Sequence, residues 1–237
     1  VYFNALRKPL EVKRRGLISD RVKTSDHRAY WKRAVESKSS EPRGLYNGHF
    51  KAGSTSELIS QVDAALRHIP YCTGYAPANW CNITDLATEK QPGNFSAEKM
   101  RTIQLMAAKF NTNNKQLGRD MMNHAEACQI LPEEHGGSRK GKQAVEQVLN
   151  KRLALDVTRQ TRRAAGQVGT DAASCYDRIE HVPTSISMQR LGVKEGPVAS
   201  LFRTLQNSIH RIRTPFGDSG VRFVSGPRDP IQGIGQG

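Results

Sequence analysis

Long hydrophobic runs are absent from this 237-residue chain, in which no stretch approaches eighteen consecutive apolar residues. The opening segment, residues 1–8, also lacks the apolar core and small-residue cleavage site of a signal peptide. These absences argue against membrane insertion and against secretion. We therefore expect an intracellular protein, and the sequence leaves the choice between nucleus and cytoplasm open, together with the oligomeric state.

Cysteines are few, and their spacing forms no pattern. The four of them form no CxxC pair and have no His-x₃₋₅-His partner. Neither a zinc site nor a disulfide framework is indicated, and reduced thiols fit an intracellular protein.

Acidic residues are scarce relative to basic ones, with 22 Asp+Glu against 36 Lys+Arg and a formal net charge of +14. Residues 1–38 hold eleven basic and four acidic residues, and residues 139–163 hold eight basic and two acidic ones. Two separate basic regions predict a long track for a polyanion, with binding that weakens steeply as salt rises. For the N-terminal run, a solvated helix face explains the charge equally well.

Local signals predict helices and strands in mixed order. Ser54 and Glu57 have the spacing of a capping box, and Pro70 is expected to end the helix that follows. Further helices are predicted over 117–128, over 142–163, in a segment ending at Gly192, and near 198–209, with β-like runs near 209–216 and 221–224. Each of three predicted helices has an apolar face that we expect to point inward. These faces are Leu58, Val62, Ala65, Leu66 and Ile69 in the helix before Pro70, Leu117, Met121, Met122 and Ala125 in the helix over 117–128, and Val145, Val148, Leu149 and Leu153 in the helix over 142–163.

The segment from residue 83 to 105 predicts a β-hairpin, because two β-prone runs flank the turn-rich centre 89–94. Strands and helices alternate without regular βαβ units. This pattern favours an α+β fold over a doubly wound sheet.

Asp171 follows a short possible strand and precedes a helix, which is a good position for a metal ligand. Carboxylate oxygen suits Mg²⁺, which takes one or two carboxylates and keeps water or phosphate in its other positions. Taken alone, the signal is weak, and an ordinary helix cap would be the better explanation of an isolated aspartate there.

Several short blocks occur in one order along the chain. They are Ser40-Glu41-Pro42-Arg43-Gly44-Leu45, Glu89-Lys90-Gln91-Pro92-Gly93-Asn94 followed by Met100-Arg101-Thr102-Ile103, the block 135–144 (HGGSRKGKQA), Asp171-x₄-Tyr176-Asp177, and Ile231-Gln232-Gly233. In this order they resemble the blocks of reverse transcriptases, particularly those of non-LTR retrotransposons and group II introns. The resemblance covers residues 39–237.

The resemblance implies a right-hand polymerase: a basic N-terminal extension or linker over 1–38, fingers over 39–165 and a truncated palm over 166–237. The implied activity is RNA-directed DNA polymerase, which uses two Mg²⁺ ions to extend a DNA primer on an RNA template with deoxynucleoside triphosphates. Asp171 would be the catalytic carboxylate, and it would bind the metal together with the carbonyl of Ala172.

The resemblance also implies contacts with substrate. The matched nucleotide-binding residues are Lys90, Arg101, Tyr176, Gln232 and Gly233, and the matched template-binding residues are Gly137 and Arg139. Lysine and arginine would grip the triphosphate, the tyrosine ring would crowd a 2′-hydroxyl, and glycine would let backbone approach the ligand. Without the family, the cations would be solvated surface groups and the tyrosine a core residue.

Two departures from the family leave alternatives open. The glycines of residues 166–170 weaken the strand expected before Asp171, and no Asp-Asp pair of the second catalytic motif occurs in the sequence. The chain begins without Met and ends in open chain, so we expect a fragment that is itself inactive. The main alternative is a non-catalytic nucleic-acid-binding remnant of a retroelement. A third is a basic helical protein with chance matches, which predicts no hairpin and no approach of Asp171 to Gln232.

Overall fold

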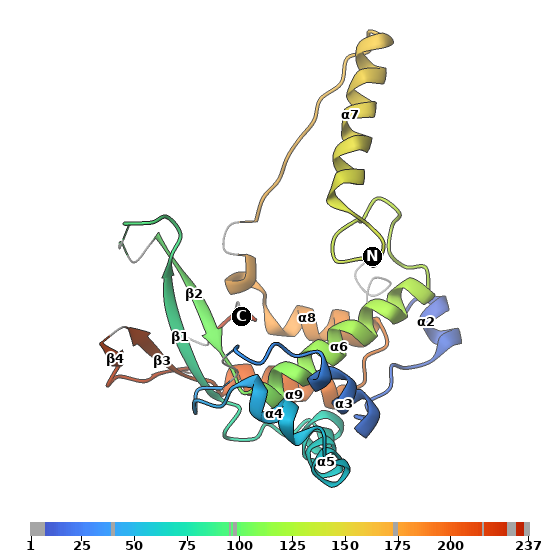
Figure 1. The fold of residues 1–237 in the computed structure, drawn as a ribbon. Coiled ribbons are helices and arrows are strands. Elements are labelled where there is room, and N and C mark those ends of the chain that lie inside the picture. The colour runs from blue at the N-terminus through green and yellow to red at the C-terminus, as the bar shows by residue number, and fades with distance from the viewer. Residues whose placement is uncertain are drawn as a thin grey trace.

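A computed structural model describes residues 8–38, 41–94, 96, 99–172, 175–214, 216–226 and 231–234 of the chain. Residues 1–7 of the expected extension, Ser40 of the first block and the end of the chain, residues 235–237, lie outside this description. Helices and strands are mixed in the α+β manner expected (Figure 1). In the described ranges, no helix has the length and hydrophobicity needed to cross a bilayer.

One mixed sheet joins the two halves of the chain. It contains β1 (Asn82–Glu89), β2 (Met100–Leu105), β3 (Ile209–Thr214), β4 (Gly217–Asp218) and β5 (Phe223–Val224). β1 and β2 are antiparallel, which confirms the predicted hairpin, and β3 runs parallel to β1 with Ile83 opposite His210. β4 and β5 both pair antiparallel with β3. A strand expected in the fingers therefore pairs directly with one expected in the palm.

The core cluster joins this sheet to four helices, α5 (Glu57–Thr73), α6 (Ala108–Ala127), α8 (His181–Arg190) and α9 (Glu195–Gln206). The predicted inward face of α6 is confirmed for three of its four residues, since Leu117 and Ala125 are buried and Met121 packs against the core, while Met122 is only partly buried. The helix begins nine residues earlier than the expected residue 117, at residue 108. α9 ends at Gln206, and β3 begins three residues later.

The basic segment 8–38 is packed against the rest of the fold. It contains α2 (Leu10–Arg15) and α3 (Thr24–Lys32), and α4 (Asn47–Gly53) follows. Val12 and Trp31 are each 1% exposed, and Ile18 belongs to the main core cluster. The cations of this segment thus surround apolar side chains that anchor it.

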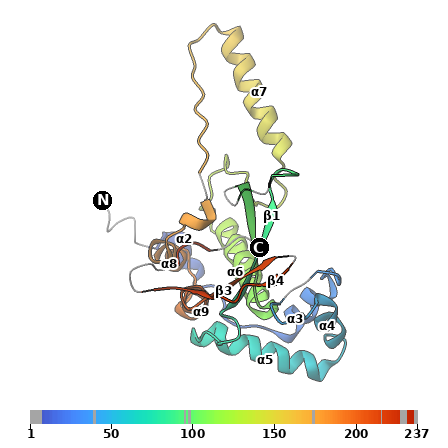
Figure 2. The same cartoon turned by 90° about the vertical axis from the view of Figure 1, so that its left-hand side faces the viewer.

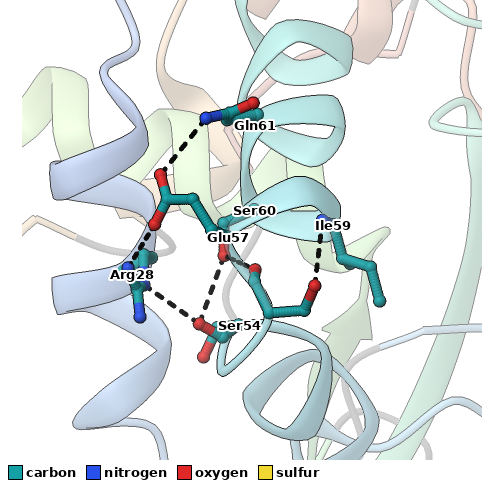
Figure 3. Close-up of polar contacts among 7 residues, drawn as sticks. Arg28, Ser54, Glu57, Ile59, Ser60 and Gln61 are labelled. Atoms are coloured by element: carbon teal, nitrogen blue, oxygen red, sulfur yellow. Dashed lines mark hydrogen bonds and ion pairs between the residues drawn. The ribbon is translucent and has the colours of Figure 1, made fainter.

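The predicted capping box at Ser54 is wrong. α5 (Glu57–Thr73) begins after Ser56, whose hydroxyl accepts a hydrogen bond from the amide of Ile59 at 3.4 Å (Figure 3). Ser54 instead donates its hydroxyl to the Lys51 carbonyl at 2.7 Å, at the end of α4. Ser54 has the glutamate three residues later that the capping box requires, but it belongs to the end of the preceding helix, so Ser56 caps α5 as a simple N-cap.

The carboxylate of Glu57 joins α5 to α3 (Figure 3). It accepts from Arg28, whose Nε also donates to the Ser54 carbonyl at 3.1 Å, and from Gln61 at 3.4 Å. This junction fixes the start of α5 against the basic N-terminal segment.

The end of α5 also differs from the prediction. Pro70 lies inside the helix and is buried, and the helix continues to Thr73. Proline removes one intrahelical donor but leaves the carbonyl acceptor in place. Gly74, with a φ of 74°, ends the helix by donating its amide to the Pro70 carbonyl at 3.0 Å.

The packed face of α5 is opposite to the expected one. Its apolar stripe is exposed, with Leu58, Val62, Leu66 and Ile69 between 50% and 71% exposed. The buried face carries Ser60, Ala64, Arg67, Pro70 and Tyr71. The side chain of Arg67 lies in the core, where neutral polar groups surround it.

α7 (Ala144–Gln160) confirms the predicted helix but contradicts its predicted core face. Figures 1 and 2 show it projecting away from the body of the protein. No residue of α7 is buried, and Val145, Val148, Leu149 and Leu153 are 54–68% exposed. Its basic residues, among them Lys151, Arg152 and Arg159, are exposed as well.

Candidate functional site

The β1–β2 hairpin presents to solvent two of the cations named in the sequence analysis, Lys90 and Arg101. Lys90 follows the last residue of β1, and its amide donates to the Lys99 carbonyl at 3.2 Å. Arg101 lies on β2 opposite Thr88, and both cations are exposed. Gly93 has a φ of 82° and donates its amide to Glu89 Oε2 at 2.9 Å, which closes the turn.

Two segments more than fifty residues apart in the sequence are hydrogen-bonded to each other. They are residues 176–181, which follow Asp171, and residues 231–234, which we call the tail. The amide of Gly233 donates to the Ile179 carbonyl at 3.1 Å, and the amide of Ile234 donates to the Tyr176 carbonyl at 3.0 Å. His181 Nε2 donates to the Gly233 carbonyl at 2.6 Å. Two blocks matched separately in the sequence therefore form one local structure.

Gly233 is the point of closest approach between these two segments. Its φ is 85°, and a Cβ built there would lie 2.5 Å from the Tyr176 carbonyl oxygen. Any side chain would therefore force the segments apart. Tyr176, whose carbonyl makes this contact, is half-exposed, and Gln232, the residue before Gly233, is exposed.

A cavity of about 340 Å³ adjoins residues 231 and 232 of the tail. Gln232 and Ile231 line it together with His181 and Pro183 of α8 and Gln206 at the end of α9. Tyr176 is not among its lining residues. The cavity gives the exposed glutamine amide a concave neighbourhood in which it can donate and accept hydrogen bonds.

Asp171 and Ala172 lie at the end of an extended return from α7 to the 3₁₀ helix η2 (Cys175–Arg178) (Figures 1 and 2). The possible strand before Asp171 is not formed, since residues 163–172 belong to no helix or strand. The glycines of this stretch explain that outcome, because glycine weakens a strand. Both Asp171 and Ala172 are exposed.

The donor set around Asp171 does not by itself fit a two-magnesium centre. Within the described ranges, no three histidine, cysteine, aspartate or glutamate side chains gather into a metal-binding group. Asp177, six residues on, is likewise exposed. Asp171 thus offers one carboxylate, and magnesium bound to it would need further ligands from phosphate, water or acidic residues outside this chain.

Arg139, matched to a template contact, is already engaged within the protein. Its Nε and Nη2 donate to the two carboxylate oxygens of Glu126 at 2.7 and 2.8 Å, and its Nη1 donates to the Pro132 carbonyl at 2.7 Å. This bidentate ion pair raises the pKa of Arg139 and lowers the pKa of Glu126, in each case chiefly through the hydrogen bonds between the two side chains. Gly137, nearby, is exposed. The arginine therefore ties the loop after α6 to that helix.

Sequence reasoning missed a row of arginines on the sheet. Residues two apart in a strand share a face, so Arg211 opposite Thr84, Arg213 opposite Leu86 and Arg101 opposite Thr88 lie on the same side. Arg213 forms a fork with Asp218 at 2.6 and 2.9 Å. The alternation of arginine within residues 209–214 was the signal that could have identified this row.

The structure thus brings Tyr176 and Gly233 together. It puts Lys90 and Arg101 on one hairpin and holds Arg139 in a separate ion pair. No protein-family profile matches the chain, and no curated protein shows significant sequence similarity to it.

The contact at Gly233 makes a direct prediction. Gly233→Ala should destabilise the docking of the tail by about 1–3 kcal/mol, because the new methyl group meets the Tyr176 carbonyl at a positive φ. Hydrogen exchange at the Ile234 amide should accelerate correspondingly. Gly93→Ala is the matched control, since its φ is 82° but nothing lies within 4 Å of the added Cβ. Equal effects of the two substitutions on Ile234 exchange would contradict the proposed contact.

Proposed function

We propose that this chain is the fingers and partial palm of a retroelement reverse transcriptase, and that it binds an RNA template paired with a DNA primer. The observation that carries the proposal is the hydrogen-bonded contact between residues 176–181 and residues 233–234. A polymerase of this type needs these two blocks side by side at the nucleotide. The predicted hairpin between β1 and β2 supports the same assignment, because chance matches in a basic helical protein predict no hairpin.

The exposed groups around this contact suit a nucleotide. Tyr176 is 50% exposed, so its ring can lie against a sugar, and Gln232 can approach a base pair from the tail. Lys90 and Arg101 would hold the triphosphate as a point charge and a bidentate fork respectively. The arginine row on the sheet and the basic residues of α7 would follow the backbone of the hybrid.

In this proposal the chain by itself catalyses no reaction. In a polymerase that carries the second acidic motif, Asp171 and the Ala172 carbonyl would hold magnesium, which stabilises the attacking and leaving oxygens of nucleotidyl transfer. This chain has no Asp-Asp pair. Its own residues would bind and orient the primer end and the nucleotide.

A second function is a nucleic-acid-binding remnant without catalysis. The observation that favours it is Asp171, which is exposed in a coil where an active palm would have a strand. The two functions share the basic surface. They differ in whether the chain recognises the end of a primer.

Photocrosslinking separates these functions with the chain as it is. A DNA primer with 4-thiothymidine at its 3′ end is annealed to a longer RNA template, bound to the protein and irradiated. The polymerase proposal predicts that the crosslinked peptides come from residues 171–181, 231–234 or the hairpin. The control hybrid carries the same base in the middle of the primer and should crosslink to the arginine row or α7 instead.

Identical crosslink maps from the two hybrids would overturn the polymerase proposal and support the remnant. Loss of binding should be steep in salt for either function, because each phosphate contact releases counterions. Binding that is unchanged between low and high salt would contradict both.

A further inference from the structure

A second cavity lies on the face of the sheet that faces away from the arginine row. Its volume is about 340 Å³, within the range typical of small-molecule sites. Asp85, Thr102 and His210 supply its polar groups, and its walls are apolar, formed by Ala87, Ile212, Phe223 and Ile231. Successive side chains of a strand point to opposite faces of the sheet. Asp85, Ala87, His210 and Ile212 therefore lie on the cavity face, and the arginine row lies on the other face.

The acidic residue of this cavity is held by a buried polar chain. His210 Nδ1 donates to Asp85 Oδ2 at 2.9 Å, and His210 Nε2 lies 2.9 Å from the hydroxyl of Ser208. That hydroxyl also lies 2.6 Å from the Leu205 carbonyl. The Ser208 residue is 1% exposed, which shields its oxygen from a substrate, so this arrangement positions Asp85 and is not a nucleophile for hydrolysis.

One carboxylate oxygen of Asp85 has no hydrogen-bond partner among the described residues. Asp85 Oδ1 is buried, and no hydrogen-bond donor reaches it from the described part of the chain. A buried acceptor without a donor costs free energy that a bound donor can recover. The side chain of Asp85 is 13% exposed, so the cavity has limited access to it.

We propose that this cavity binds a planar organic cation of the amidinium or guanidinium class with an apolar or aromatic body. The amidinium would donate to Asp85 Oδ1, and the flat body would lie against Phe223 and Ile212. The chain carries a net charge of +14, so long-range electrostatic repulsion opposes the binding of such a cation. Binding must therefore come from the local carboxylate and the apolar walls. The site does not depend on whether the chain binds a primer and template.

Benzamidine and benzamide are suitable probes, because they have nearly the same shape but only benzamidine is a cation. Ligand-observed saturation-transfer NMR on the whole chain should give a dissociation constant on the order of 1 mM for benzamidine, as expected for a ligand of this size. Benzamide should bind about 10-fold more weakly, since it lacks the charge-assisted hydrogen bond. Equal binding of the two probes, or no binding of benzamidine, would overturn the proposal.

Two substitutions and one control locate the site. Asp85→Asn should weaken benzamidine about 10-fold while changing benzamide by less than about 2-fold. Glu89→Gln removes a carboxylate at the other end of β1, where it is exposed and bonded to the Gly93 amide, and should leave both probes unchanged. A similar loss with Glu89→Gln would overturn the assignment to Asp85.

Asp85→Asn also alters the hydrogen bond with His210, and the Asp85→Asn protein could therefore fail to fold. A second variant tests the site without changing Asp85. Ile231→Trp fills the cavity from the tail and leaves Asp85 and His210 in place. It should abolish binding of both probes at an unchanged melting temperature. Benzamidine binding retained in a folded Ile231→Trp protein would contradict this location.

Discussion

Arg67→Ala should lower the free energy of unfolding by about 3–5 kcal/mol, the loss typical when a buried hydrogen-bonded cation is removed and a cavity remains. The guanidinium is 1% exposed and connects three helices. It donates to Asn113 Oδ1 at 3.0 Å and to Gln116 Oε1 at 3.1 Å on α6. It also lies 3.3 Å from His27 Nδ1 on α3.

The network around Arg67 is closed by further bonds. Asn113 donates its amide to the Arg67 carbonyl at 3.1 Å, and Gln116 donates to the Arg21 carbonyl at 3.2 Å. No carboxylate hydrogen-bonds to the guanidinium among the residues that the structure describes, and burial lowers the pKa of Arg67 to about 10. At neutral pH it remains charged, and its removal leaves three buried acceptors without a donor.

Chemical denaturation measures this effect. Arg119→Ala on α6 is the control. Arg119 is exposed, and its ion pair in the described part of the chain is with its neighbour Asp120 at 3.3 Å, so the substitution should change stability by less than about 0.5 kcal/mol. Arg67→Met tests the polar term separately, since it restores most of the volume but none of the donors. Wild-type stability for Arg67→Met would show that the network contributes only by filling space.

Stability should also fall on acidification between pH 6.5 and about 4, because His27 resists protonation in the folded protein. Burial lowers the pKa of His27 from its ordinary 6.5 to about 4, and the neighbouring charge of Arg67 acts in the same direction. The unfolded chain takes up a proton at this histidine in that window and the folded protein does not. The stability is therefore complete above pH 6.5 and is lost as the pH falls, by about 3 kcal/mol in total.

His27→Gln isolates this contribution. Glutamine keeps an acceptor for Arg67 but does not titrate, so the variant should lose most of the slope of unfolding free energy between pH 6.5 and 4. The pKa of His124 is also lowered, chiefly by burial, and its contribution remains in both proteins. Parallel curves for the wild type and the variant would show that His27 does not stay neutral in the folded state.

Local signals in the sequence predicted much of the secondary structure. The hairpin around residue 93, α6, α7 and the helix ending near Gly192 all form, because glycine turns and helical periodicity act over a few residues. The prediction of a strand before Asp171 was wrong for an equally local reason, because the glycines of residues 166–170 weaken a β-strand.

The candidate site was predictable only in part. The matched blocks identified Tyr176 and Gly233, and the hydrogen bonds between them required the folded chain. Arg139 has the residue type of a template contact, but its bond to Glu126 becomes visible only in three dimensions. The role of Asp171 as a metal ligand stays a prediction.

The sequence by itself determined that this protein is basic, α+β and built around a hairpin, because charge and short-range backbone preferences need no distant partner. Tertiary structure decided which faces are buried. α5 turns Arg67 inward and leaves Leu66 in solvent, since a guanidinium that finds three acceptors can occupy a core that periodicity alone assigns to leucine. The partners of Arg67 lie forty or more residues away, and only folding brings them together.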